Sequence, residues 1–384
     1  MSTAPKLLLG VVLARCPGSF AGHTCATMNW ALSFRELGWD VWITEHINGD
    51  EIKPPEAPGN ASPQEEFWRE TVKEFGFEGR ECLLVNGESA ELKAMRDFVA
   101  EAELFLNYSG QFKRLDLIPA KTCKAYLDVD PAFTQIWVEV HGSDMNFDGH
   151  DVFLTVGTTL NHPTARIPKV GREWIPILPP VAAAQWRERL GEPPPLTVDA
   201  AWTTIAHWYG YPELRWEDLR YAGKRESLLA MKDLPTMVNR PCAIATDLKT
   251  DWYDHAPFAA AGWQFLSASE ICRDVPTYLR FIAASRGEIG IAKEGYVVSR
   301  GGWMSDRSMV YLALGRPVLL QDTGWPGAVA PGPGLLPFTN PADCAAAMAE
   351  IDANYDQHCA GARSLAETTH GPAHALRPLL DQIS

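Results

Sequence analysis

Residues 287–324 constrain the fold of this 384-residue chain more than any other segment. Two short apolar runs, 288–292 and 316–321, flank a nearly all-apolar run at 307–314. The outer runs are typical of buried strands, and the middle run predicts a helix. Because this helix would be apolar on almost every side, we expect it to be buried. The segment therefore predicts a strand, a buried helix and a second, parallel strand.

Capping residues mark both ends of this predicted helix. Ser305 and Asp306 can each serve as its N-cap. Gly315 follows the last apolar residue, where a left-handed residue commonly ends a helix. The strand that follows runs into a polar loop at 322–324, at the carboxyl end of a parallel strand. Ligands bind at this edge of open α/β sheets.

The turn before the helix has the features of an anion site. Gly301 and Gly302 precede a helix start that carries Ser305, Arg307 and Ser308. Free backbone amides, the positive end of the helix dipole and a guanidinium together suit a diphosphate. The alternative is that the glycines form only a tight turn and that Arg307 pairs with a nearby carboxylate.

Composition narrows the class of protein. The length allows two domains, and 46% hydrophobic with 21% charged residues is typical of a globular protein. A net charge of −14 disfavours a broad basic surface for nucleic acid. The eight cysteines lack metal-type spacing, so reduced cytosolic thiols are the simplest interpretation. The apolar run at 7–14 is too short to span a bilayer, and we expect a cytoplasmic protein without a membrane span.

The first half of the chain predicts a doubly wound sheet of about six strands. Residues 6–14 form a near-continuous apolar run, as expected of a central parallel strand. A glycine-rich loop with Gly18 and Gly22 follows, and Thr24 is expected to cap a helix that stops at Gly38. The other strands are expected at 40–44, 82–85, 104–107, 124–129 and 153–156.

A proline-rich segment at 175–181 resembles a linker, because three prolines disfavour a regular element there. A second α/β series follows, with strands expected at 202–207, 242–246 and 263–266. We expect an acceptor-side Rossmann-like domain over 1–178 and a donor-side one over 179–364. A last helical segment, 365–384, can pack back on the first domain. Two such halves would face each other across a cleft.

Two motifs resemble nucleotide-sugar glycosyltransferases of the GT-B fold. Gly22-His23, followed sixteen residues later by Gly38-Trp-Asp-Val, resembles the GH…GHxV opening of that family. The segment 301–318 resembles its donor-site signature, a glycine-rich turn and polar helix start that lead to Gly-x-Pro-Val. Lys224-Arg225, at a predicted helix start, resembles the basic pair that clamps the diphosphate.

The resemblance implies further donor contacts. Asp322, Thr323 and Gly324 fall where the family places a polar loop against the donor sugar, and Ser267 begins the segment where the base would rest. Arg300 is a further candidate cation. Retaining glycosyltransferases of this fold typically place two glutamates, seven residues apart, around the donor. Here Glu294 is present, but Val310 occupies the position expected for the second, and Asp306 is the nearest acid, which leaves the stereochemical outcome open.

His23 is the candidate general base of the transfer. An imidazole titrates near neutral pH and can take the proton of an acceptor hydroxyl. Inverting members of the family use a histidine in this loop, oriented by an aspartate, and Asp128 or Asp130 could fill that role here. Alternatively, His23 only caps the helix or hydrogen-bonds the loop. As a separate alternative, the two aspartates form a metal-binding pair.

The resemblance as a whole implies metal-independent transfer of a sugar from a nucleoside-diphosphate sugar, with a UDP-sugar favoured, to a hydroxyl acceptor. No cofactor is expected besides this co-substrate. Three alternatives stay open: an epimerase, a phosphorylase, and a binder of nucleotide sugars without catalysis. A modified nucleic-acid base is a further candidate acceptor, although the acidic charge disfavours it.

Overall fold

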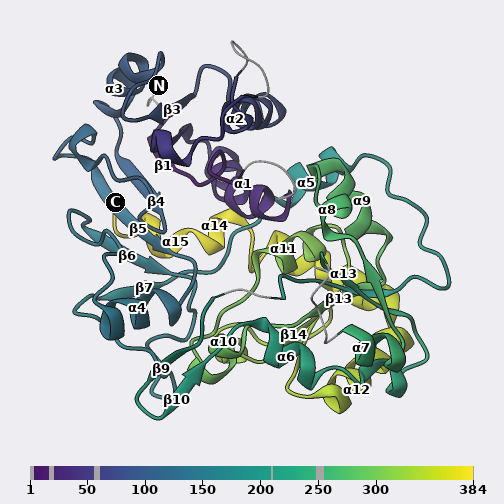
Figure 1. Ribbon diagram of the computed structural model, residues 1–384. Helices are drawn as coiled ribbons and strands as arrows, with labels where there is room; N and C mark the ends of the chain where they lie inside the picture. Colours follow the sequence, from purple (N-terminus) through teal and green to yellow (C-terminus); the bar gives the residue numbers. More distant parts are fainter. Residues whose placement is uncertain (1–3, 17–20, 56–60, 209–210, 248–254, 384) are drawn as a thin grey trace.

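The computed structural model describes residues 4–16, 21–55, 61–208, 211–247 and 255–383. Figure 1 shows two α/β lobes side by side, with the N-terminal half of the chain in purple to blue and most of the second half in teal to yellow. We call the first sheet and its helices lobe 1, and the second sheet and its helices lobe 2.

Lobe 1 is built on a seven-stranded sheet in the order β3-β2-β1-β4-β5-β6-β7, with every neighbouring pair parallel. β1 pairs with strands on both sides and is covered on both faces, which explains its apolar sequence KLLLG. Its elements are β1 (Lys6–Gly10), α1 (Ala21–Glu36), β2 (Asp40–Ile47), α2 (Pro63–Glu74), β3 (Glu81–Val85), α3 (Leu92–Val99), β4 (Leu104–Tyr108), β5 (Cys123–Asp128), α4 (Phe133–His141), β6 (Val152–Thr155) and β7 (Trp174–Pro176).

Lobe 2 contains a six-stranded parallel sheet in the order β12-β11-β8-β13-β14-β15 and an antiparallel hairpin of β9 with β10. The strands are β8 (Trp202–Ile205), β9 (Leu214–Trp216), β10 (Leu219–Tyr221), β11 (Cys242–Ala245), β12 (Trp263–Leu266), β13 (Gly287–Gly290), β14 (Val318–Gln321) and β15 (Leu335–Phe338). The helices are α5 (Ala183–Leu190), α6 (Lys224–Ala230), α7 (His255–Ala261), α8 (Ala268–Ile271), α9 (Val275–Ala284), α10 (Glu294–Ser299), α11 (Asp306–Ala313), α12 (Pro341–Ala353) and α13 (Tyr355–Glu367).

The predicted pair of doubly wound sheets is confirmed, with two corrections. The segment 175–181 is not wholly irregular, because its start belongs to β7, the seventh strand of the first sheet. β7 lies at the edge of that sheet and pairs with only one neighbouring strand. Proline has no N–H to donate, but Pro176 is tolerated there because an edge strand has one side without a partner strand. The β9–β10 hairpin and the short helix α10 were not predicted from the sequence.

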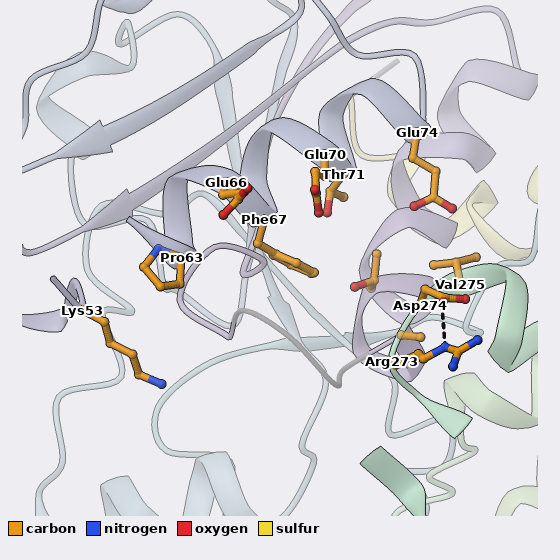
Figure 2. Close-up of a pocket in the computed structure, with 12 residues that line it drawn as sticks. Lys53, Pro63, Glu66, Phe67, Glu70, Thr71, Glu74, Arg273, Asp274 and Val275 are labelled. Atoms are coloured by element: carbon orange, nitrogen blue, oxygen red, sulfur yellow. Dashed lines mark hydrogen bonds and ion pairs between the residues drawn. The ribbon is translucent and has the colours of Figure 1, made fainter. Parts of the chain in front are cut away.

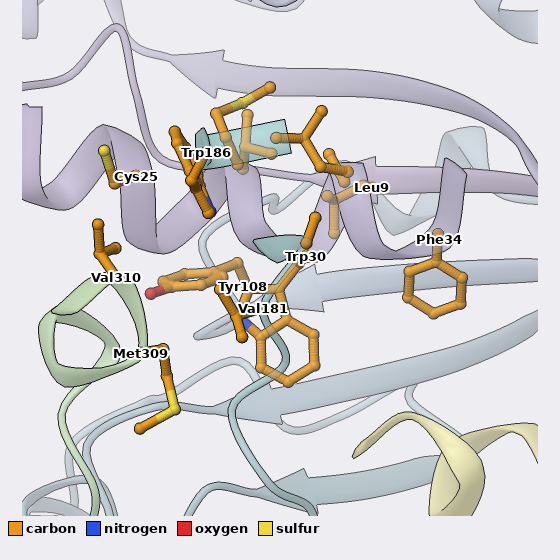
Figure 3. Packing of buried hydrophobic residues seen from close by; sticks show 14 of the residues in the cluster. Leu9, Cys25, Trp30, Phe34, Tyr108, Val181, Trp186, Met309 and Val310 are labelled. Carbon is orange, nitrogen blue, oxygen red and sulfur yellow. The ribbon is translucent and has the colours of Figure 1, made fainter. Parts of the chain in front are cut away.

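One apolar core runs from lobe 1 into lobe 2 around α1 and α11 (Figure 3). Trp30 of α1 and Val310 of α11 are fully buried members of this core. Trp186 of α5 joins them and donates a hydrogen bond from its indole to Asn29 of α1. The predicted burial of the helix 307–314 is confirmed, because residues 308–313 are all buried. Gly315 has the expected left-handed backbone, with φ 70°.

The chain ends with two short helices, α14 (Pro372–Ala375) and α15 (Arg377–Leu380), which contact α1 and β7 of lobe 1. His370, just before them, donates a hydrogen bond from Nδ1 to the carbonyl of Pro179 at 3.0 Å, and its own carbonyl accepts one from Val181 N–H at 2.8 Å. The end of the chain is therefore fastened to the segment that joins the two lobes. The domain boundaries expected at residues 178 and 364 stay a prediction.

Candidate active site

Arg307 lies in the first turn of α11, at the carboxyl end of β8 and beside β13. Its Nε donates to Glu288 Oε1 at 2.6 Å, and its Nη1 donates to the carbonyl of Ile205 at 2.9 Å. Burial opposes its charge, but the fully buried Glu288 carboxylate outweighs that effect and raises the pKa of Arg307. The pairing with a nearby carboxylate, left open by the sequence, is therefore present. Nη2 is buried and has no hydrogen-bond partner among the described residues.

Lys224, the first residue of α6, brings a second cation to this place. Its side chain is only 9% exposed, and its ammonium makes no hydrogen bond or ion pair with any residue that the structure describes. Burial lowers the pKa of Lys224 well below its ordinary value, and the charge of Arg307 lowers it further, against the opposing pull of Glu288. A buried cation without a counter-ion is costly, so an anion would satisfy this site.

The start of α11 is less simply capped than predicted. Ser305 is the N-cap, but its side chain makes no capping hydrogen bond. Ser308 N–H donates to the Ser305 carbonyl at 3.0 Å, and the Ser308 hydroxyl is buried without a partner among the described residues. Burial raises the pKa of Asp306 to about 7, and the charge of Asp130 acts in the same direction.

The glycine turn packs against lobe 1 instead of standing free. Gly302 has φ 78°, and its N–H donates to the Thr323 carbonyl at 2.8 Å. Thr158 Oγ1 of lobe 1 donates to the Gly302 carbonyl at 2.7 Å, and Thr159 N–H donates to the Gly301 carbonyl at 3.0 Å. The prediction that the amide of Gly302 is free for a diphosphate is therefore wrong. Its left-handed backbone and this close approach explain the glycine.

The polar loop after β14 is held by its own side chains. Arg300 Nη1 forms an ion pair with Asp322 Oδ1 at 3.0 Å, and Gly324 N–H donates to the same oxygen at 2.7 Å. Thr323 is fully buried, and its hydroxyl donates to the carbonyl of Trp303 at 2.6 Å. Arg300 remains 40% exposed, so of these residues it has the most freedom to meet a ligand.

The remaining predicted site residues belong to helices or a helix cap, or lie outside the described chain. Ser267 caps α8 by accepting a hydrogen bond from Glu270 N–H at 3.2 Å. Arg225, next to Lys224, lies 3.4 Å from the Glu226 carboxylate. Gly22 lies within α1, whereas Gly18 lies outside the described residues.

His23 belongs to the first turn of α1, because this helix begins at Ala21 and not at Thr24 as predicted. Its Nε2 lies 2.6 Å from the Val12 carbonyl. Since a carbonyl only accepts, Nε2 carries the proton, and Nδ1 of the neutral ring keeps a lone pair. Nδ1 makes no hydrogen bond with the described residues. Burial lowers the pKa of His23, which favours the neutral form that a general base needs.

Asp128 is not the residue that orients His23, and that prediction is wrong. It is fully buried at the end of β5 and accepts hydrogen bonds of 2.8 Å from Thr134 Oγ1, Gln135 Nε2 and Thr155 Oγ1. These bonds tie β5 to β6 and to the start of α4. Burial nevertheless raises the pKa of Asp128 to about 6. Its role in the structure is to hold the strand ends together.

Asp130 links the two lobes and does not hydrogen-bond to His23. Lys293 Nζ of lobe 2 donates to Asp130 Oδ1 at 2.9 Å, Tyr211 OH donates to Oδ2 at 2.6 Å, and Tyr296 OH also donates to Oδ1. Burial disfavours the carboxylate, but Lys293 and the two hydroxyls keep the pKa of Asp130 below its ordinary value. Its negative charge acts on His23 and favours the imidazolium.

Sequence reasoning missed Glu288, the second residue of β13, and Lys293, three residues after the end of that strand. The signal for Glu288 was a lone charged residue inside the apolar run 288–292. Lys293 follows that run directly, and its ammonium lies 3.7 Å from the centre of the Tyr211 ring. Among the residues that the structure describes, no three His, Cys, Asp or Glu side chains are grouped to hold a metal ion. No described helix is long and apolar enough to cross a membrane.

Solved structures share this architecture over the whole chain. An alpha-glucosyltransferase, solved with UDP-glucose and DNA containing an abasic site, matches over 100% of both chains at 10% identity with a TM-score of 0.57. Anabaena Alr3699/HepE, solved with UDP, matches over 99% of both chains at 10% identity with a TM-score of 0.54. A glycosyltransferase from Rickettsia africae matches over 100% of this chain and 98% of its own at 10% identity, with a TM-score of 0.53.

No protein-family model matches the sequence, and no curated protein matches it significantly. At about one residue in ten identical, the likeness to the solved structures concerns the fold. The sheet orders, the parallel strands and the full-length matches agree on that point. This chain therefore has the GT-B fold, two Rossmann-like lobes that face each other, as the sequence predicted.

Proposed function

We propose that this protein is a glycosyltransferase that moves a sugar from a UDP-sugar to a hydroxyl acceptor without a metal ion. The observation that carries the proposal is Lys224, a buried lysine that makes no ion pair with any residue that the structure describes. Beside it lies Arg307, which has one buried nitrogen unpaired among the described residues. Glu288 balances only one of the two positive charges. A nucleoside diphosphate brings the negative charge that this place lacks.

The fold supports the same assignment. Similar solved structures hold UDP or UDP-glucose, as in the alpha-glucosyltransferase and in HepE. The candidate anion site lies at the carboxyl end of β8, and this end of parallel strands is where open α/β sheets bind ligands. Fold alone does not assign a reaction, so the proposal depends on the residues at this edge.

In the proposed reaction, His23 acts as the general base. Its Nδ1 accepts the proton of the acceptor hydroxyl, and the freed oxygen forms a bond to the anomeric carbon of the donor sugar. The bond from that carbon to the diphosphate oxygen breaks, and its electron pair leaves with UDP. Lys224 and Arg307 stabilise the charge that develops on the diphosphate. Asp130 stabilises the imidazolium through its charge.

Calorimetric titration with UDP, UMP and uridine tests donor binding. If Lys224 and Arg307 hold the diphosphate, the affinity should rise from uridine to UMP and again from UMP to UDP. Equal affinities for UMP and UDP, or no binding of UDP, would contradict the proposed site.

Release of UDP from UDP-glucose, measured with and without a panel of hydroxyl acceptors, tests the reaction. A glycosyltransferase releases UDP in step with the formation of a glycosylated product. An epimerase would change the donor sugar in the absence of any acceptor, and a phosphorylase would require inorganic phosphate. Either result would replace the proposal with one of these alternatives.

A further inference from the structure

Glu45 of β2 is an acidic side chain in the interior of lobe 1. It is only 2% exposed, at the end of a run of buried residues that begins at Val41. Among the described residues, no lysine, arginine or histidine side chain forms an ion pair with its carboxylate. Burial raises the pKa of Glu45, against hydrogen bonds from the backbone and the charge of Arg15. A buried carboxylate is costly, so its partners indicate what it is for.

The partners of this carboxylate are three successive backbone amides in the loop after β1. Leu13 N–H and Ala14 N–H donate to Oε2 at 2.8 and 2.7 Å, and Arg15 N–H donates to Oε1 at 3.0 Å. Three donors to one carboxylate favour its charged form. The side chain of Arg15 turns elsewhere, since its Nε pairs with Glu51 at 2.9 Å. Glu45 therefore fixes the backbone of residues 13–15.

One of these amides belongs to the peptide group that holds His23. The carbonyl of Val12 and the N–H of Leu13 are the two ends of one planar, trans peptide group, and they point in opposite directions. The N–H donates to Glu45, and the carbonyl lies 2.6 Å from Nε2 of His23. Carboxylate, peptide and imidazole thus form one continuous chain of two hydrogen bonds.

We infer that Glu45 is a positioning residue that orients His23, and strengthens it as a base, through the peptide group between Val12 and Leu13. Hydrogen bonds in a chain polarise one another, so a carboxylate on the N–H makes the carbonyl oxygen a stronger acceptor. The carbonyl then holds Nε2–H more firmly and leaves the lone pair on Nδ1 for the acceptor hydroxyl. Glu45 itself does not touch the reacting atoms. The inference rests on the proposed function for the role of His23 as the base.

The other groups around the ring do not replace this chain of bonds. The charge of Asp130 favours the imidazolium, but its carboxylate is bonded to Lys293 and two tyrosines of lobe 2. Tyr108 packs edge to face against the ring, with 6.5 Å between the ring centres. Among the described residues, only the Val12 carbonyl forms a hydrogen bond with the ring of His23. The orientation of the imidazole therefore depends on that carbonyl.

The acidic residues of α2 lie to another side of α1. Figure 2 shows Glu66, Glu70 and Glu74 beside a groove of about 510 Å³, which α1 lines through Thr24. Successive residues of a helix are about 100° apart, so His23 points in a different direction from this groove. None of these three carboxylates forms a hydrogen bond with the ring.

Nitrogen-15 NMR of the histidine rings tests the chain of bonds without any substrate. It reports the pH at which His23 titrates, and His23→Gln identifies its signals. Burial lowers the pKa of His23, and the hydrogen bond to Val12 opposes that effect. Because Glu45→Gln weakens this bond, it should lower the pKa further. A purely structural loss would let water reach the ring and would move the pKa up, toward its ordinary value.

Glu45→Gln keeps nearly the same shape as the wild type and disturbs the bonds. The amide has one accepting oxygen, and its NH₂ group meets a backbone N–H without accepting from it. The control is Glu81→Gln, the same change in the neighbouring strand β3, where the carboxylate accepts from the indole of Trp68 at 2.8 Å. The control should leave the pKa of His23 unchanged.

The direction of the pKa shift decides the inference. A pKa of His23 that falls in Glu45→Gln and stays constant in Glu81→Gln supports it. A pKa that rises, or that equals the wild-type value, overturns it. If Glu45→Gln does not fold, Glu45→Asp takes its place. This variant keeps the charge but shortens the side chain by one methylene, so the pKa should fall by a smaller amount, and no fall would again overturn the inference.

Transfer kinetics give a second readout, with UDP-glucose and an acceptor that yields product in the panel test. Partners that orient metal-bound histidines change activity by about 10-fold to 100-fold when they are removed, and we expect Glu45→Gln to lower kcat by that order. The KM for the acceptor should stay within about twofold, because Glu45 does not touch the substrate. A raised KM with an unchanged kcat would contradict a role through His23.

UDP binding separates this inference from the proposed function. It reports on Lys224 and Arg307 of lobe 2 and should be the same in the wild type, Glu45→Gln and Glu81→Gln. If the pKa of His23 falls as expected but the wild type glycosylates no acceptor, the proposed function fails and the action of Glu45 on His23 stands. If the wild type transfers sugar but the pKa does not fall, only the role of Glu45 is wrong.

Discussion

Lys224→Met should make the free protein more stable and UDP binding weaker. Methionine keeps much of the length of the lysine side chain and removes its charge from a place that is 9% exposed and has no counter-ion among the described residues. Replacing buried ionic groups by apolar ones is often neutral or stabilising by about 1 to 4 kcal/mol. Because burial lowers the pKa of Lys224, the gain should be largest at pH values below that lowered pKa. The stability gained by Lys224→Met should decrease as the pH rises toward the ordinary lysine pKa, because Lys224 is then deprotonated in the unfolded chain as well as in the folded protein.

The loss of UDP binding can be worked out from one charged hydrogen bond. Such a bond contributes about 1.5 to 3 kcal/mol, which corresponds to a Kd raised about 10-fold to 150-fold. At a UDP concentration of about 100 times the wild-type Kd, UDP should stabilise the wild type by about 2.7 kcal/mol. A variant with a 30-fold higher Kd should gain only about 0.9 kcal/mol under the same conditions.

Calorimetry gives the Kd, and urea denaturation with and without UDP gives the two stabilities. Lys121→Met is the control, because it removes one positive charge from an exposed position of lobe 1. It should leave both quantities unchanged. The reasoning would be refuted if Lys224→Met bound UDP as tightly as the wild type. It would also be refuted if the variant were less stable than the wild type across the pH range, because Lys224 would then have a structural partner.

Four further outcomes follow from the site. His23→Gln should keep the Kd for UDP within about twofold and lower the transfer rate by about 100-fold to 10,000-fold, measured by product formation. Asp130→Asn leaves Lys293 without its carboxylate and should cost about 3 to 5 kcal/mol in urea denaturation. Because the pKa of Asp130 is lowered, the wild type should lose this contribution only as the pH falls through that lowered pKa, and the variant should lack that loss. Gly302→Ala should destabilise by about 1 to 3 kcal/mol in the same assay, since φ is 78° and the new methyl would lie 2.5 Å from a threonine hydroxyl. The wild type should bind UDP more weakly as the pH rises through about 7, because the Asp306 carboxylate becomes charged and repels the diphosphate. Asp306→Asn should remove this change in affinity. Calorimetry at pH 6 and pH 8 on both proteins checks the prediction.

The sequence predicted the strands and the buried helix well because these elements depend on local patterns. The apolar run 307–314 needs cover on all sides, and the structure places α11 between α1, α5, α9 and α13. β7 was missed because Pro176 argues against a central strand, and only the finished sheet shows that this strand lies at an edge. The hairpin of β9 with β10 was missed because its packing against α4 and α10 is a contact between distant segments.

The sequence predicted part of the candidate site, and the two wrong predictions, for Asp128 and Gly302, have the same cause. Lys224 and Arg307 were found because basic residues at helix starts are visible in the sequence. Asp128 was a candidate partner of His23, although its carboxylate accepts three side-chain hydrogen bonds from α4 and β6. Gly302 was assigned to the ligand although its amide is bonded to Thr323. In both cases a polar group had a partner elsewhere in the fold, and no sequence pattern reveals such a partner.

The proposed reaction divides its residues between the lobes, and Asp130 connects the two sets. His23 belongs to lobe 1, whereas Lys224 and Arg307 belong to lobe 2. Asp130 accepts hydrogen bonds from Lys293 and two tyrosines of lobe 2, and the same carboxylate favours the charged form of His23. If the lobes separated at this point, Asp130 would be hydrated and its effect on the imidazole would weaken. Burial has the larger effect and lowers the pKa of His23, so the ring is kept in the neutral form that a general base needs, and the charge of Asp130 restores part of its basicity while the lobes are together.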